Sequence, residues 1–157
     1  MSTYEILTAI QSSAIGQAIA KSDHLVGATA QIFHVLGFIF LLSSLVLINL
    51  RLLGVTLTNL SIPEVAKEPL RFIWAGLFFA VSSGILMFVS APLLYWTNPA
   101  FDLKIVLLVA AVLLQVTAYR KVISSETPNP ALARASVAAS VVLWFGVGLA
   151  GRAIGYV

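Results

Sequence analysis

The chain contains no cysteine, and this absence excludes several kinds of chemistry at once. Without thiols there is no disulfide, no thiolate nucleophile, no iron–sulfur cluster and no cysteine-based zinc site. Histidine and methionine are also scarce, with two residues of each. A copper site would have to draw on this small ligand set, and the histidines available to a metal are His24 and His34.

Charge is the second scarce feature. Charged residues make up 10% of the 157 residues, whereas hydrophobic residues make up 60%. Soluble domains carry roughly 25% charged residues, so a chain of this size could not hide its apolar surface from water, and we expect a lipid environment. The nine basic residues lie scattered at the ends of apolar runs. They form no basic face for nucleic acid, and we expect no nucleic-acid partner.

The apolar runs predict an all-α fold, a four-transmembrane-helix bundle preceded by an amphipathic interfacial N-terminal helix. Each run meets or approaches the roughly 20 residues that a bilayer requires. The chain is then a single integral membrane domain, with an interfacial helix at 3–21 and spans at about 25–50, 72–95, 103–119 and 137–154.

Local signals mark where several helices begin. Ser2 with Glu5 has the spacing of a capping box, and the mixed polar and apolar residues that follow suit a helix at the membrane surface. A second capping box at Ser61 predicts a short surface helix within the longest loop. Asn98 and Asn129, each followed by proline, predict the starts of the third and fourth membrane helices.

The basic residues favour one orientation. The first and third loops hold six of them: Arg51, Lys67, Arg71, Arg120, Lys121 and Arg134. The opposite side holds three: Lys21, Lys104 and Arg152. Because basic loops remain on the cytoplasmic side, the loops are expected inside and both termini outside.

Ionisable residues at membrane depth are costly and mark candidate functional sites. His34 lies about ten residues into the first span. Gly27, Gln31, His34 and Gly37 follow at steps of four, three and three, which predicts one small, polar helical face pointing into the bundle.

Two basic residues are expected in the same membrane leaflet as His34. Lys104 opens the third helix, and Ala111 and Gln115 continue its face. Arg152 lies near the end of the fourth helix, among glycines that permit close packing. The sequence therefore predicts that Lys104 and Arg152 converge with His34.

This cluster suits a haem, in which His34 ligates iron while Lys104 and Arg152 meet the propionates. His24 lies on the same helix, about 15 Å along the axis and roughly 80° around it, so the two histidines cannot be opposite axial ligands. A haem b would need a single histidine, Met87, or His34 of a second protomer.

The same residues, with Gln31, also suit a quinone headgroup, an anion or a metal ion. The purely structural interpretation is an imidazole bonded between helices, with Lys104 and Arg152 extending to the interface. Trp144 lies deeper than the other tryptophans, and its indole N–H needs a partner. The sequence shows no nucleophile–base constellation and no carboxylate inside a span, and we assign no catalytic residue.

Three parts of the chain carry a resemblance: residues 31–37 with 50–54, residues 74–76 with 98–104, and residues 151–156. With one histidine in the first span, an Asn-Pro-x-Phe-x-x-Lys start to the third and a late Gly-Arg, the chain resembles a family of small four-span bacterial inner-membrane proteins of unassigned function. More remotely, it is similar to copper-resistance D-type membrane proteins and small membrane cytochromes b. The resemblance implies four spans in a bacterial inner membrane and points to His34, Lys104 and Arg152. In such a membrane the orientation favoured by the basic residues makes both termini periplasmic.

The leading hypothesis is a small redox-associated membrane protein that holds haem or a quinone headgroup near His34. The alternative is a non-catalytic accessory or assembly subunit of a larger membrane complex, which the small residues Ser82, Ser83 and Gly84 would suit. Transport of a small solute or metal is third. The expected partners are the lipid bilayer and either further copies of the chain or other subunits.

Overall fold

A computed structural model describes residues 2–21 and 24–156, and within them all regular secondary structure is helical, without a strand. Four helices are long and apolar enough to cross a membrane, which confirms the four-helix membrane bundle. They are α3 (His24–Leu52), α4 (Ile62–Ser90), α6 (Pro99–Leu114) with its continuation, and α8 (Pro130–Ala153).

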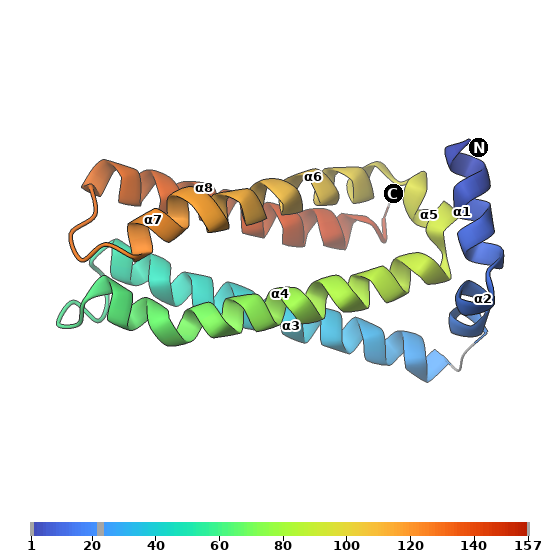
Figure 1. The fold of residues 1–157 in the computed structure, drawn as a ribbon, viewed down its shortest axis with the longest axis horizontal. Coiled ribbons are helices and arrows are strands. Elements are labelled where there is room, and N and C mark those ends of the chain that lie inside the picture. The colour runs from blue at the N-terminus through green and yellow to red at the C-terminus, as the bar shows by residue number, and fades with distance from the viewer. Residues whose placement is uncertain (1, 22–23, 157) are drawn as a thin grey trace.

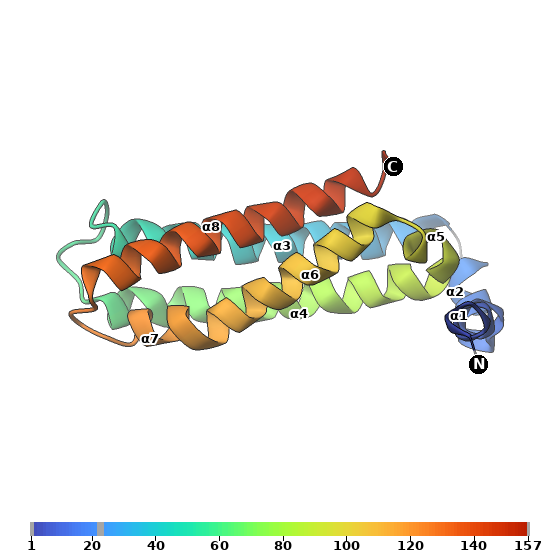
Figure 2. The same cartoon turned by 90° about the horizontal axis from the view of Figure 1, so that it is seen from above.

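The bundle is built from two helix pairs. Helix α3 packs along α4, α6 packs along α8, and the pairs meet mainly where α8 crosses α3 (Figures 1 and 2). The loops α3–α4 and α7–α8 lie together at one end, whereas both chain ends lie at the other (Figure 1). This arrangement is the one expected of four consecutive crossings.

The N-terminal segment lies across the end of the bundle, roughly perpendicular to the long helices (Figure 1). It forms two helices, α1 (Thr3–Ser12) and α2 (Ala14–Ala20), where the sequence predicted one. The break occurs because the extended Ser13 starts a new helix, its hydroxyl accepting a bond from the Gly16 amide at 3.0 Å. The capping box at Ser2 and Glu5 is confirmed.

Helix α4 begins ten residues before the predicted start of the second span at 72. The capping box of Ser61 and Glu64 is present, but it starts the membrane helix itself rather than a separate surface helix. The helix ends earlier than predicted, at Ser90, because the residue before a proline disfavours helical geometry. After Ala91, Pro92 opens the short helix α5 (Pro92–Trp96).

The third membrane helix changes geometry within the bilayer. Helix α6 passes into a π-helical turn, η1 (Gln115–Tyr119), and then into α7 (Arg120–Ile123). The helix therefore continues through the basic pair Arg120 and Lys121 and ends at Ile123, beyond the predicted end of the span at about 119. The caps at Asn98 and Asn129 are confirmed, because each side chain accepts bonds from two backbone amides.

Two glycines set the distance between α3 and α4. A Cβ built on Gly37 would lie 2.7 Å from the carbonyl oxygen of Gly76, and one on Gly76 would overlap the carbonyl oxygen of Gly37. The two backbones are thus in direct contact, as small residues allow in membrane helices. Gly37 thus makes room for the neighbouring helix α4.

A buried hydrogen bond ties the third helix to the first. Tyr119, with no exposed surface, donates its hydroxyl to Oδ1 of Asn49 at 2.8 Å. Few competing partners exist inside an apolar bundle, so the pair fixes the rotation of η1 against α3.

We expect Tyr119→Phe to lower the free energy of unfolding by about 1–3 kcal/mol, because the Asn49 carbonyl would lose its buried donor. Unfolding in detergent, followed by circular dichroism, measures the change. Tyr4→Phe is the control, since Tyr4 is exposed on α1. Equal stability of the two variants would contradict a structural role for the buried bond.

Candidate functional site

His34 joins three helices near the end of the bundle that carries the termini. From α3, its imidazole contacts Ser83 of α4, with Nδ1 3.2 Å from Oγ. Its other nitrogen, Nε2, lies 3.3 Å from Nζ of Lys104 on α6. The side chain is only partly buried. The structure thus brings together two of the predicted site residues, His34 and Lys104, and adds Ser83.

The hydrogen bonds around His34 select one tautomer. Ser83 donates its single hydroxyl proton to the carbonyl oxygen of Phe79 at 2.5 Å, so toward the imidazole its oxygen acts as the acceptor. Nδ1 therefore carries the proton and donates to Ser83. Nε2 is left as the acceptor of a bond from Nζ of Lys104.

Two glycines make room for these side chains, although the sequence pointed to Gly27 and Gly37. A Cβ on Gly84 would lie 3.3 Å from Cε1 of His34, and one on Gly151 would lie 3.3 Å from Nζ of Lys104. The imidazole therefore rests against α4 and the lysine against α8. Gly27, in contrast, has nothing within 4 Å of its Cβ position.

A partly open cavity of about 790 Å³ adjoins the site between α2, α3 and α4. Its wall is mainly apolar and includes Phe33, Phe79, Leu86 and Met87. Ser83 belongs to the same wall, so the residue that His34 contacts also lines the cavity. The cavity therefore joins apolar space, open to lipid-soluble molecules, to a polar pair.

Gln31 and Arg152 do not reach the site. Gln31 is exposed, because the face of α3 that carries Gly37 packs against α4. Gln31 lies about 120° around the helix from Gly37. Arg152 is also exposed: it donates a hydrogen bond to the Tyr156 hydroxyl and lies 4.5 Å from the centre of that ring. The predicted convergence of three basic groups is thus reduced to His34 and Lys104.

Of the two predicted metal ligands, the structure describes the surroundings of His34 alone. Within the described residues, no group of three His, Asp or Glu side chains lies close enough to hold a metal ion. The side chain of His24 lies outside the described part of the chain, and no placement is given for it. For His34, both ring nitrogens already face a polar partner, so a metal at Nε2 would have to displace Lys104.

Sequence reasoning missed Ser83 and Gly84 as site residues. The small residues Ser82, Ser83 and Gly84 were noticed, but for helix packing. The available signal was Ser83 followed by Gly84 in the second span. The serine gives the imidazole a hydrogen-bond partner, and the glycine leaves space for its ring. Only the pairing of α3 with α4 places Ser83 opposite His34.

Comparison with known protein families gives a match over most of the chain. A family model described as a family of unknown function (DUF6644) covers residues 8–157. No curated protein and no solved structure matches the chain.

Proposed function

This chain belongs to the family of unknown function DUF6644, and we propose that it is a small redox-associated membrane protein that holds a quinone headgroup near His34 and Lys104. The observation that carries the proposal is the apolar cavity whose wall includes Ser83, the hydrogen-bond partner of His34. Ligand sites combine apolar walls with a few placed polar groups in this way.

The chemistry of the pair suits a quinone. A quinone carbonyl accepts hydrogen bonds, and Nδ1–H of His34 would donate to it by exchanging its present acceptor, Ser83, for the carbonyl oxygen. The ring and its isoprenoid tail would lie against Phe33, Phe79 and Leu86. Reduction of the headgroup adds negative charge, which the Lys104 ammonium would stabilise in this low-dielectric setting.

Haem is the less favoured cofactor. The expected cluster of His34 with Lys104 and Arg152 suggested it, but iron ligation needs a free imidazole nitrogen. Nε2 faces Lys104 at 3.3 Å and Nδ1 faces Ser83 at 3.2 Å. Haem binding would therefore require His34 to exchange one of these partners for iron.

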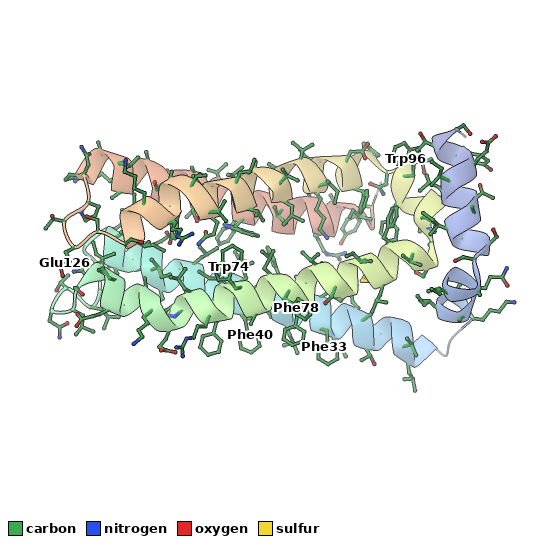
Figure 3. The ribbon with its side chains drawn as sticks, viewed as in Figure 1. Phe33, Phe40, Trp74, Phe78, Trp96 and Glu126 are labelled. Atoms are coloured by element: carbon green, nitrogen blue, oxygen red, sulfur yellow. The ribbon has the colours of Figure 1, made fainter. Side chains whose placement is uncertain are left out.

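An accessory subunit of a larger membrane complex is the second candidate function. The outer face of α3 and α4 carries exposed aromatic rings, with Phe33 stacked on Phe79 and Phe40 on Phe72 (Figure 3). Such a surface suits lipid and equally suits an apolar partner subunit. In either role we place the protein in the bacterial inner membrane with both termini periplasmic, because the basic residues gather near the loop end.

The first test is the quinone content of protein purified in mild detergent, measured by solvent extraction and chromatography. We expect about one quinone per chain for the wild type and strong depletion for His34→Leu, because the variant loses the donor. An absorption spectrum of the same sample, oxidised and reduced, tests for haem. Protein that carries neither cofactor but retains stoichiometric partner proteins would favour the accessory subunit.

A further inference from the structure

Four buried polar side chains in the third and fourth membrane helices have no hydrogen-bond partner within the described part of the protein. Gln115 and Ser136 are each 3% exposed, and Ser140 and Trp144 are each 1% exposed. Both polar atoms of the Gln115 amide are unpaired, as is the indole N–H of Trp144. An unpaired buried group costs about 1–3 kcal/mol, so four together require an explanation.

Gln115 and Ser140 lie at one level of the bundle, and Ser136 and Trp144 lie about 6 Å to either side of Ser140 along α8. Ser136, Ser140 and Trp144 are spaced by four residues along α8 and so share a face. The opposing helix runs antiparallel to α8, with Lys104 beside Gly151. Gln115 lies eleven residues after Lys104, and Ser140 lies eleven residues before Gly151. Both residues therefore lie about 16 Å, measured along the helix axes, from the contact between Lys104 and Gly151.

Other contacts support this register. A Cβ on Gly146 would lie 3.1 Å from Cδ1 of Leu107, and Trp144 shares a core cluster with Ala111 and Tyr119. Because Ala111 and Tyr119 lie four residues on either side of Gln115, the amide is expected on the face of the helix that meets α8.

The two serines differ from several other serines in the membrane helices. Ser43, Ser82 and Ser90 each donate to a carbonyl oxygen of their own helix. That bond is the usual way for a helical serine to satisfy its hydroxyl. Ser136 and Ser140 make no such bond. Their oxygens therefore remain available to something between the helices.

The backbone is irregular at the same place. Gln115 opens the π-helical turn η1, and its backbone N–H donates to the carbonyl oxygens of both Ala111 and Val112. A π-turn widens a helix locally and is frequently found at functional sites. Here it bulges the third helix beside the unpaired groups.

We propose that Gln115, Ser136, Ser140 and Trp144 form a binding site for water inside the membrane bundle. The four side chains are neutral and supply both donors and acceptors, whereas an ion would need opposing charge. Buried water typically makes about three hydrogen bonds to otherwise unpaired groups, which this set provides. The site is separate from the cavity beside Ser83 and does not depend on the proposed quinone.

Hydroxyl-radical footprinting by X-ray radiolysis tests the proposal on the wild-type protein, because radicals form at bound water. We expect Trp144 to be oxidised at no less than about a tenth of the rate of Trp96, although it is buried. Trp96 is the internal reference, since it is 49% exposed at the end of the bundle. Background oxidation of Trp144 would overturn the proposal.

Variants give a second, independent readout. Gln115→Leu is expected to reduce Trp144 oxidation at least about threefold and to lower the Tm by several degrees, because bound water loses its main partner. Ser140→Ala should act in the same direction and removes only one atom. Ser43→Ala, which removes a hydroxyl bonded to its own helix, should change neither quantity. A higher Tm for Gln115→Leu with unchanged oxidation of Trp144 would show that no water is bound there and would overturn the proposal.

Discussion

Lys104→Met is expected to weaken binding of a short-chain quinone to the purified protein at least about tenfold, equivalent to about 1.4 kcal/mol. Lys104 holds Nε2 of His34 as an acceptor and so keeps the proton on Nδ1, the nitrogen beside the cavity. Without the ammonium, the imidazole is free to move its proton to Nε2. The donor toward the headgroup is then lost together with the nearby positive charge.

Titration of the purified variant with quinone, followed by quenching of tryptophan fluorescence, measures this loss. The matched control is Lys121→Met, which removes the same charge from an exposed position near the opposite end of the third membrane helix. Its affinity should equal that of the wild type. Equal affinities for both variants would refute a role for Lys104 in quinone binding.

Gly76→Ala is expected to have the largest effect on stability, lowering the free energy of unfolding by about 3 kcal/mol. The added methyl group would overlap the carbonyl oxygen of Gly37 and lie 2.9 Å from the backbone nitrogen of Leu41. Both obstacles are backbone atoms, which cannot turn aside as a side chain can. The helices α3 and α4 would have to separate, and His34 would then move away from Ser83.

Gly27→Ala is the matched control for this prediction, because nothing lies within 4 Å of the Cβ position on Gly27. Alanine favours helix over glycine by about 0.8–1.0 kcal/mol, so this variant should be as stable as the wild type or slightly more stable. Denaturant unfolding in mixed micelles compares the two. Similar stability for Gly76→Ala and Gly27→Ala would contradict the close backbone contact.

The candidate site was predictable in part. His34 and Lys104 stand out in the sequence because an ionisable residue at membrane depth is rare and costly. Gln31 and Arg152 were wrongly grouped with them, since both are exposed. Helical spacing places residues on a shared stripe, but it does not say which edge of that stripe faces the neighbouring helix. Ser83 was missed because serine is ordinary in membrane helices.

The sequence by itself determined the four spans, the caps at Ser2, Asn98 and Asn129, and the all-helical class. Each depends on composition or on contacts between residues a few positions apart. Only the tertiary structure decided how the helices are rotated and paired: His34 meets Ser83 across 49 residues and Lys104 across 70. The physical reason is that lipid is as apolar as the bundle interior, so hydrophobicity does not mark the inward face, and close packing and polar contacts between helices set it instead.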